Sequence, residues 1–446
     1  MQKLNVAVIG SGIAGLSAAW LLSKSHNVTI FEKEDHIGGH SNTQIAETTN
    51  EAIPVDTGFI VYNEENYPNL TALFDHLDVQ TSASNMSFSY SLDNGVYEYS
   101  GAGLPGLFAQ RSNLVRLKHW GMLRDIQRFF SSAAHTINKY PQDTTLGTFL
   151  DQEKYGRTFC EDHILPMAAA IWSSPASDIR TFPARSFIDF YANHGLLKIK
   201  NRPQWRTVSG GSFEYVKQIV ADGKFSVVTN CQIASVKRYS NSVLICDDSG
   251  NRSYFDQVVF ACHGDVALRL LQNPTSQEEK ILGNFRYSDN KVVLHCDNRF
   301  MPIRRSLWSS WNYTKRSENA GKSKESSTAI TYWMNLLQPL KTHTDLFVTV
   351  NPNDEICPSK RFYQTNCRHP LMDLNATSAQ KHLWDLQGKN CSWYCGSYFG
   401  YGFHEDALQS GLAVAEELGG LKRPWKVNND SGRIHRTTST FLKAAE

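Results

Sequence analysis

Residues 6–40 read VAVIGSGIAGLSAAWLLSKSHNVTIFEKEDHIGGH. A short apolar run is followed by Gly10, Gly12 and Gly15, which have the spacing G-x-G-x-x-G. A helical pattern comes next, and a second apolar run then ends at Glu32. Strand, glycine turn, helix, strand and acidic residue occur in the order that a dinucleotide-binding βαβ unit requires.

The three glycines have different predicted tasks. Gly10 forms the tight turn, Gly12 lets backbone N–H groups approach a pyrophosphate, and Gly15 lets the helix pack against the strand. Ile13 and Ala14 begin the helix, whose N-terminus would face the negative charges of the pyrophosphate. We therefore expect all five residues to belong to a cofactor site.

Two features after the helix extend this site. Glu32 is placed to accept hydrogen bonds from both ribose hydroxyls and would repel a 2′-phosphate, and Lys33 follows it. Gly38 and Gly39 fit a second close passage of the backbone beside an extended dinucleotide, with a plain glycine turn as the alternative. Both NAD and FAD agree with the first turn, whereas the glycine pair favours FAD.

This combination of GxGxxG, an acidic strand end and a GG pair resembles the N-terminus of the FAD-binding amine oxidase and phytoene desaturase superfamily. The residue after GG is often arginine there, whereas His40 and Ser41 follow here, so a fixed positive charge near the flavin phosphates is not assured. The resemblance implies an α/β fold. Its parts would be a discontinuous Rossmann-like FAD-binding domain of the glutathione-reductase type 2 and a mixed α+β substrate or cap domain.

The chain divides accordingly. The expected FAD-binding domain comprises residues 1–65, 205–270 and 385–428. The expected cap comprises residues 66–204, where helical spacing dominates, and residues 271–384. A polar stretch from Gly321 to Ser327 predicts a mobile loop, and residues 429–446 read as a loosely held basic tail.

The composition excludes several classes of protein. Hydrophobic residues make up 41% of the 446 residues, and a net charge of +2 gives no bulk attraction to nucleic acid. No window approaches the roughly eighteen apolar residues of a spanning helix, and the glycines interrupt the first apolar run, which disfavours a secretory signal. Nine scattered cysteines without CxxC or HExxH spacing predict free thiols and no metal site. The expected location is the cytosol.

Two later segments resemble FAD-contacting parts of the superfamily. In the central segment, the backbone around Val236 would contact the adenine. Near the C-terminus, residues 391–407 read CSWYCGSYFGYGFHEDA, a strand followed by a turn at Gly396 and Gly402 that opens a helix. The free N–H groups of such a helix could stabilise negative charge on a reduced isoalloxazine ring.

The candidate catalytic residues follow from the same resemblance. A closing segment of this shape carries an aromatic side chain that encloses the substrate over the flavin, and by position this is Phe403, which lacks a phenol. The acidic residue usual after the first glycine is replaced by Ser397. His404 is a candidate proton carrier or a partner for a flavin carbonyl, with a structural histidine as the alternative. Lys291 precedes a strand as the flavin-adjacent lysine of many amine oxidases does, with a surface lysine as the alternative.

A narrower resemblance covers about residues 1–425. It is to flavin-containing amine-oxidase-like proteins that are often encoded beside, or fused to, cyclopropane-fatty-acid-synthase-like methyltransferases. It implies an FAD oxidoreductase whose substrate is a lipid acyl chain, with such a methyltransferase as a candidate partner. The motifs that carry it are GGHSNT, VDTGF, MSFSYSL, IWSSP, NHGLL, RPQWRTVSGGS, HCDNRFMP, WSSWNY, MNLLQ and GFHEDALQSGL.

Other side chains have two readings each. Five could line a pocket on the cap side or pack in the core: His295, Trp308, Trp311, Asn312 and Asn335. Asp56 at a strand end could stabilise a turn or reach the cofactor. The stretch from Gly103 to Phe130 mixes apolar and basic residues, as an interfacial helix on anionic lipid does, and ordinary amphipathic packing is the alternative.

The sequence as a whole predicts an FAD-dependent oxidoreductase that transfers hydride at flavin N5 on a hydrophobic substrate, such as a fatty acyl chain. An amine oxidase that produces hydrogen peroxide is the first alternative. A non-catalytic flavin-binding partner of a lipid methyltransferase is the second. Contact with the inner face of a membrane is left as an addition to the cytoplasmic location.

Overall fold

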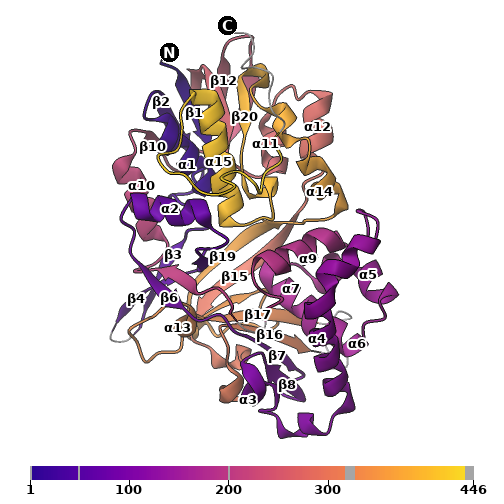
Figure 1. The fold of residues 1–446 in the computed structure, drawn as a ribbon. Helices are drawn as coiled ribbons and strands as arrows, with labels where there is room; N and C mark the ends of the chain where they lie inside the picture. The colour runs from indigo at the N-terminus through magenta and orange to yellow at the C-terminus, as the bar shows by residue number, and fades with distance from the viewer. Residues whose placement is uncertain (1–2, 49–50, 199–200, 317–326, 437–446) are drawn as a thin grey trace.

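The computed structural model describes residues 3–48, 51–198, 201–316 and 327–436. Five parallel strands form its first sheet, in the order β10-β2-β1-β14-β20 (Figure 1). Their bounds are β1 Asn5–Ile9, β2 Asn27–Phe31, β10 Ser226–Val228, β14 Gln257–Phe260 and β20 Ser392–Tyr394. Because three distant segments supply these strands, the prediction of a discontinuous Rossmann-like fold is confirmed.

Helix α1 (Ile13–Leu22) is buried on all sides, because it lies against this sheet on one face and against α15 (His404–Gly419) on the other. A Cβ atom on Gly411 of α15 would lie 2.2 Å from the carbonyl oxygen of Ala14. The two helices therefore touch backbone to backbone. Helix α10 (Phe213–Asp222) also packs against α1.

A three-stranded antiparallel sheet lies in the connection between β10 and β14, and two helices follow β14 before the chain enters the cap. The strands are β11 Ile233–Arg238, β12 Val243–Asp247 and β13 Arg252–Phe255. The helices are α11 Gly264–Leu270 and α12 Ser276–Leu282.

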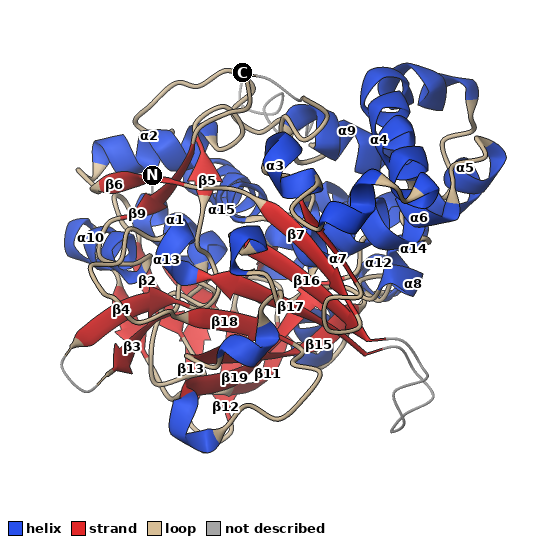
Figure 2. Cartoon of the chain, turned by 90° about the horizontal axis from the view of Figure 1, so that it is seen from below, coloured by secondary structure: helices blue, strands red, loops and turns tan. Residues whose placement is uncertain are grey.

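The cap is built on a mixed sheet of seven strands, ordered β19-β15-β18-β17-β16-β7-β8. The strand bounds are β7 Phe88–Leu92, β8 Tyr97–Ser100, β15 Tyr287–His295, β16 Trp311–Arg316, β17 Ser327–Trp333, β18 Phe347–Val350 and β19 Arg361–Pro370. Figure 2 shows helices gathered beside one end of this sheet: α3 Gly103–Leu107, α4 Leu117–Thr136, α5 Leu146–Gln152, α6 Arg157–Phe159, α7 Leu165–Trp172, α8 Ala176–Ile179 and α9 Ala184–Asn193.

Short elements join the two halves. They are the pair β3 Thr43–Glu47 and β4 Ala52–Asp56, the sheet β5 Tyr62–Asn63, β9 Trp205–Val208 and β6 Thr81–Ser84, and the helices α2 Pro68–His76, α13 Met334–Leu337 and α14 Leu374–Gln380. Helices α2 to α9 dominate residues 66–204, as expected, and three short strands, β6, β7 and β8, lie among them. Strands β7 and β8 carry alternating serine and tyrosine residues, which a search for apolar helical spacing does not detect.

The predicted domain boundaries remain a proposal. The buried apolar side chains form two large clusters, one around the five-stranded sheet and one in the cap, which divide the chain in a similar but not identical way. Leu70 and Phe74 of α2 belong to the cluster around the five-stranded sheet, whereas Val55 of β4 belongs to the cap cluster. In both places the chain is packed on the other side of the predicted boundary. The predicted loop from Gly321 to Ser327 lies outside the described residues, except for Ser327, with which β17 begins.

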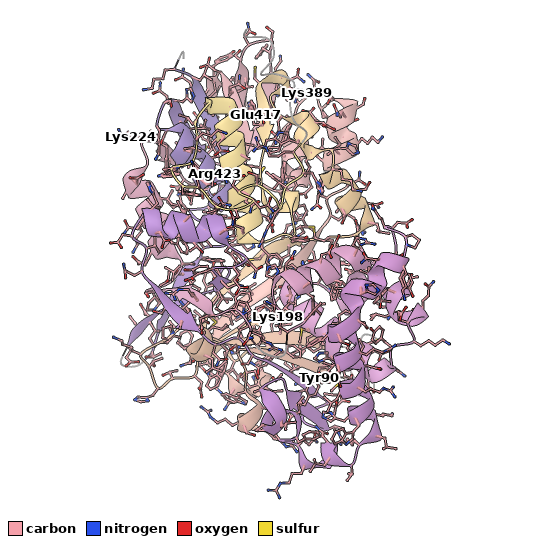
Figure 3. The ribbon with its side chains drawn as sticks, in the orientation of Figure 1. Tyr90, Lys198, Lys224, Lys389, Glu417 and Arg423 are labelled. Carbon is pink, nitrogen blue, oxygen red and sulfur yellow. The ribbon has the colours of Figure 1, made fainter. Side chains whose placement is uncertain are left out.

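The expectation of a loosely held tail is wrong for residues 430–434. Ile434 is buried in the cluster around the five-stranded sheet, and the Arg433 N–H donates to Gln409 Oε1 at 3.1 Å. Arg423, labelled in Figure 3, donates to Glu416 of α15 at 2.8 Å. The last ten residues of the predicted tail, 437–446, lie outside the described residues. Among the helices that the structure describes, none combines the length and the apolar character needed to span a membrane.

Candidate flavin site

The first glycine turn has the geometry that its sequence predicts. Gly10 has a φ of +105°, which an L side chain rarely adopts, and its N–H donates to the carbonyl oxygen of Phe31 at 2.9 Å. A Cβ on Gly15 would lie 2.0 Å from the carbonyl oxygen of Gly10, so only glycine lets α1 approach β1 this closely. A Cβ on Gly12 would meet no atom within 4 Å. Gly12 therefore faces open space at the N-terminus of α1.

The second glycine turn lies directly beside the first. Gly39 has a φ of +58°, and a Cβ placed on it would lie 3.1 Å from the Cα of Gly12. The N–H of Gly38 donates to the carbonyl oxygen of Ser11 at 3.1 Å. Oε2 of Glu32 accepts from Ser11 N at 2.9 Å and from Ser11 Oγ at 2.6 Å. The structure thus brings both turns and the acidic residue together.

The closing helix meets these turns at the same edge of the sheet. β20 pairs with β14 and β14 pairs with β1, all in parallel, so the turns that follow β1 and β20 leave from the carboxyl ends of their strands. Gly396 N donates to Ser410 Oγ at 2.9 Å, and Gly402 has a φ of +96°. Asp406 caps the start of α15 by accepting from Phe403 N at 2.7 Å. Ligands of open α/β sheets bind at this edge.

His404 connects the closing helix to the first segment of the chain. Its Nε2 lies 2.7 Å from the hydroxyl of Tyr215 and 3.1 Å from Ser41 Oγ. Its ring stacks on Phe59, with the ring centroids 3.8 Å apart and the planes at 8°. Phe59 ends the VDTGF motif, and its N–H donates to the carbonyl oxygen of His40. Tyr215, Ser41 and Phe59 therefore fix the orientation of this imidazole.

Three more histidines lie near His404. The rings of His40 and His369 are 5.3 Å apart, and His263 stacks on Tyr287 at 4.2 Å. Burial, with a smaller contribution from His40, lowers the pKa of His404 and of His369 to about 3. The same two causes lower the pKa of His263 to about 4, and burial lowers that of His40.

Solvent reaches all four imidazoles, because the His40 side chain is exposed and His263, His369 and His404 are half-buried. Burial lowers the pKa of each, which keeps these imidazoles neutral near pH 7. None therefore supplies the fixed positive charge of the arginine that His40 replaces.

The residues present fit FAD. Open backbone at Gly12, with the N-terminus of α1 behind it, provides the approach that a pyrophosphate needs, and Glu32 lies at the ribose side of the same turn. His40 follows the second glycine turn and is open to solvent, as is His404 at the start of the closing helix, so an extended dinucleotide would pass beside both. Ile13 and Ala14 are buried in the first turn of α1, where their backbone helps to form this N-terminus.

The predicted contact of Val236 with adenine is not supported. The carbonyl oxygen of Val236 already accepts from Gln272 N at 3.1 Å, and the residue pairs with Ile245 in the antiparallel sheet. Cys231 is the residue of this segment next to the acidic strand end, because its N–H donates to the carbonyl oxygen of Glu32 at 2.8 Å. Lys33 is exposed and pairs with Glu34 at 3.0 Å.

Lys291 stays a prediction that the geometry does not favour. Its side chain is exposed, and its backbone N–H donates to Asn351 Oδ1 at 2.9 Å. The preceding residue, Asn290, reaches the histidines instead, with its Nδ2 3.1 Å from His369 Nδ1. Successive side chains of a strand point to opposite faces, so Lys291 and Asn290 cannot both face these histidines.

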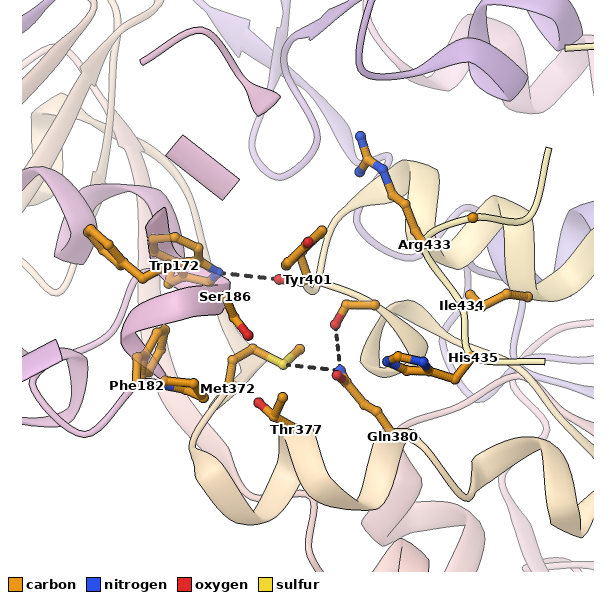
Figure 4. Close-up of a pocket in the computed structure, with 14 residues that line it drawn as sticks. Trp172, Phe182, Ser186, Met372, Thr377, Gln380, Tyr401, Arg433, Ile434 and His435 are labelled. Atoms are coloured by element: carbon orange, nitrogen blue, oxygen red, sulfur yellow. Dashed lines mark hydrogen bonds between the residues drawn. The ribbon is translucent and has the colours of Figure 1, made fainter. Parts of the chain in front are cut away.

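Phe403 packs in an aromatic cluster of the cap. Its ring stacks on Phe190 of α9 at 5.0 Å and lies 6.1 Å from Trp172 of α7. A cavity of about 170 Å³ adjoins this cluster, and Trp172 Nε1 donates to the carbonyl oxygen of Tyr401 across it (Figure 4). Met372 and Arg433 also line this cavity. The predicted aromatic residue is thus part of an apolar wall beside His404.

The five side chains with two readings serve the cap sheet. His295 bonds Thr349 Oγ1 at 2.7 Å, and Asn312 accepts from Ser89 Oγ at 2.7 Å. Asn335, Trp308 and Trp311 likewise hold loops or pack against neighbouring rings. These contacts agree with the packing reading, and the pocket reading stays a prediction.

Asp56 joins the two halves of the chain. It accepts from Thr43 Oγ1 at 2.6 Å, from Ser212 N at 2.8 Å and from Gln338 Nε2 at 3.0 Å. Burial raises its pKa to about 6, against the opposing effect of these hydrogen bonds. Of its two readings, the structural one is confirmed.

Sequence reasoning missed three residues of this site: Tyr215, His263 and His369. His263 ends the apolar run of β14, so its place at the carboxyl edge of the sheet gave a usable signal. Tyr215 lies within α10 and His369 near the end of β19, and neither is marked by a local motif. Only the folded chain brings them beside His404.

Fold and site together define an FAD-dependent oxidoreductase with a Rossmann-like cofactor domain. The model of the flavin-containing amine oxidoreductase family matches residues 13–355, and the chain belongs to this family. A curated relative from Mycobacterium tuberculosis, assigned as the flavin-containing monoamine oxidase AofH, is 24% identical over 264 residues. The match covers 55% of this chain and 54% of AofH, so the chain spans about half the length of this relative.

Two solved structures share the fold. The CLA-producing fatty acid isomerase from P. acnes superposes with a TM-score of 0.63 at 14% identity, covering 93% of this chain and 98% of the isomerase. Wild-type putrescine oxidase bound to putrescine gives a TM-score of 0.61 at 14% identity, with coverage of 94% and 99%. The expected amine-oxidase-like architecture is confirmed.

Proposed function

We propose that this oxidoreductase transfers hydride between the flavin and the hydrocarbon part of a hydrophobic substrate, with a fatty acyl chain as the substrate class. FAD supplies the hydride chemistry when bound. The residues of the chain then orient the substrate and keep water away. The observation that carries the proposal is the apolar wall formed by Phe403, Phe190 and Trp172 next to His404.

The charge state of the four histidines supports an uncharged reacting group. Burial lowers the pKa of each, so near pH 7 they offer no fixed charge to pair with an ionised substrate. One face of the Phe403 ring stacks on Phe190, so only the other face is left for a substrate. His404, held by Tyr215 and Ser41, can move a proton only as a neutral imidazole.

The fold neighbours are compatible with either substrate class, because one is a fatty acid isomerase and another is a putrescine oxidase. Amine oxidation with release of hydrogen peroxide is therefore the second candidate, favoured by the relative assigned as a monoamine oxidase. A flavin scaffold for a cyclopropane-fatty-acid-synthase-like methyltransferase, and a cytoplasmic place in lipid metabolism, stay proposals that rest on the sequence motifs alone.

Flavin spectroscopy without oxygen tests the proposal in both directions. The holoprotein is mixed with saturated acyl lipids, and the chemically reduced holoprotein with unsaturated acyl lipids, with a panel of primary amines in parallel. We expect one of the acyl series to bleach or restore the flavin spectrum and the amines to leave it unchanged. Bleaching by amines, with peroxide formed on admission of oxygen, would establish amine oxidation instead. A flavin that no compound changes would favour the scaffold.

A matched pair of variants locates the substrate. Phe190→Ala removes part of the apolar wall next to Phe403, and Tyr254→Ala removes an exposed ring on the FAD-binding half. We expect only Phe190→Ala to slow the reaction of the flavin with the acyl lipid, while both variants are reduced at the normal rate by dithionite. Equal rates for both variants would show that the substrate does not use this wall.

A further inference from the structure

One end of the cap carries a surface that we call the apolar patch. Its most exposed residues are Leu117, Val115 and Leu104, with relative solvent accessibilities of 86%, 82% and 71%. The complete set is Val96, Leu104, Leu114, Val115, Leu117, Trp120 and Ile303. Eleven large apolar residues are exposed in the part of the chain that the structure describes, and seven of them are these. Such a concentration marks an interaction surface.

Contacts between these segments show that the patch is continuous. Trp120 Nε1 of α4 donates to the carbonyl oxygen of Leu114 at 2.9 Å, and the Trp120 ring lies 5.2 Å from Phe108, which follows α3. Arg116 donates to the carbonyl oxygen of Val96 at 3.0 Å. A Cβ on Gly95 would lie 3.2 Å from Ile303. The turn between β7 and β8, helix α3 and the start of α4 thus form one face.

Positive charge is interleaved with the apolar side chains. From Gly101 to Arg124 the sequence contains no aspartate or glutamate, whereas Arg111, Arg116, Lys118 and Arg124 fall within it. Among the described residues no ion pair engages Arg111 or Lys118, and both are exposed. Apolar and cationic side chains thus alternate on this face, so its partner must accept both apolar groups and positive charges.

An anionic lipid bilayer is such a surface. Apolar side chains of an interfacial segment enter the boundary between headgroups and acyl chains, while lysine and arginine extend to the phosphates. A second copy of this chain docked through the same patch would instead bring two sets of cations, each with Arg111 and Lys118, into one interface. The core of a protein–protein interface is depleted in lysine, which sits between the exposed Leu117 and the buried His119 here.

We propose that the apolar patch, formed by the β7–β8 turn, α3 and the first turn of α4, docks this protein on the surface of an anionic lipid bilayer. The patch lies at the end of the cap farthest from the five-stranded sheet (Figure 1). The flavin half then points away from the lipid. This inference does not depend on which substrate the flavin site takes.

Co-sedimentation of the holoprotein with vesicles tests this proposal. Vesicles of phosphatidylcholine are compared with vesicles that also contain phosphatidylglycerol, at low and at high salt. We expect partition to rise with the phosphatidylglycerol content and to fall with salt. Arg111→Gln with Lys118→Gln should lower the partition coefficient about fivefold for each removed cation. Val115→Ser with Leu117→Ser should lower it about tenfold or more.

Matched controls exist on the FAD-binding half. Val228 and Tyr254 are exposed apolar residues there, and Arg252 and Lys280 are exposed cations. Their changes to serine or glutamine should leave partition at the wild-type value. Leu104→Ser in α3 is a second apolar variant in case the double variant loses its flavin spectrum or its cooperative melting.

Three results would overturn the proposal. The first is equal partition of the patch variants and the controls. The second is binding that does not depend on phosphatidylglycerol. The third is a dimer in lipid-free buffer that Val115→Ser with Leu117→Ser dissociates, in a protein that does not sediment with vesicles, since the patch would then be covered by a second copy.

Discussion

Gly12→Ala should weaken FAD binding without lowering the stability of the apoprotein. A methyl group on Gly12 meets no atom of the chain within 4 Å, and the residue has φ −65° and ψ 175°, which alanine adopts without strain. Replacing glycine at a compatible position stabilises a protein by about 0.4–1 kcal/mol, because the unfolded chain loses conformational freedom. We therefore expect the apoprotein to melt at the same temperature or slightly higher.

The same methyl group occupies the space through which a pyrophosphate must approach the backbone. Forcing an extra methylene into a packed contact costs about 1–3 kcal/mol, which corresponds to a rise in the Kd for FAD of about 5- to 150-fold. The opposite signs of the two effects distinguish this prediction from a general loss of stability.

Two alanine variants serve as controls. On Gly15 the new Cβ would lie 2.0 Å from the carbonyl oxygen of Gly10, so α1 must move away from β1, and the apoprotein should lose about 1–3 kcal/mol. On Gly121 of α4 the new Cβ meets nothing, and the change should stabilise the helix by about 1 kcal/mol with no effect on the flavin.

The assay combines the flavin absorbance per chain, titration of the apoprotein with FAD, and urea unfolding of each apoprotein. A Gly12→Ala protein that binds FAD with the wild-type Kd would refute the reasoning. So would a Gly12→Ala apoprotein that is as unstable as Gly15→Ala, because the open space at Gly12 would then have no functional meaning.

Three further outcomes are expected. Burial lowers the pKa of His295 from 6.5 to about 4, so the unfolded chain binds the proton first as the pH falls. At pH 5 this residue therefore costs about 2 kcal/mol of stability relative to pH 7. Urea unfolding of His295→Gln at both pH values should show a smaller loss of stability than the wild type, and an identical loss would contradict this. Arg433→Met leaves the buried Asp406 carboxylate without its partner at 3.3 Å and should lower the free energy of unfolding by about 3–5 kcal/mol. In a double-mutant cycle, Asp406→Asn in the same chain should restore much of this loss, whereas additive losses would argue against the pair. His404→Gln should keep the flavin and slow its reduction by substrate by about a hundredfold or more, while Lys291→Met changes neither, and stopped-flow spectra that show the reverse would exchange their roles.

The sequence was informative where function lies in contiguous residues. The turn at Gly10, the acidic end of β2 and the pair Gly38 and Gly39 are each specified by spacing within one βαβ unit. Backbone geometry requires glycine at Gly10, Gly38 and Gly39, so one sequence is enough to show the pattern. His404 could be predicted for a similar reason, because it comes just after a glycine turn.

Residues that the fold brings together from distant strands were harder to predict from the sequence. Lys291 and Asn290 differ by one position, and in a strand such a shift exchanges the two faces, so spacing alone could not select the residue that reaches His369. The sequence pointed to Val236, because an apolar run marks a strand but does not mark the residue nearest to Glu32, which is Cys231 in the folded chain.

The cap was the hardest part to predict. Its sheet orders β7 and β8 beside β16, which follows them by some two hundred residues, and no local signal specifies that pairing. The tail was misread because its polar composition resembles a free terminus, whereas Arg433 compensates the buried charge of Asp406. Pairing between distant residues is what a single sequence shows least.

The central claim is that the turn at Gly12 and the closing helix at His404 converge on a single FAD. The most direct measurement is the amount of FAD bound to the purified wild-type chain, determined from the protein spectrum and from analysis of the flavin after denaturation or proteolysis. We expect one FAD per folded chain. A correctly folded, colourless protein that also takes up no FAD on titration would contradict the claim.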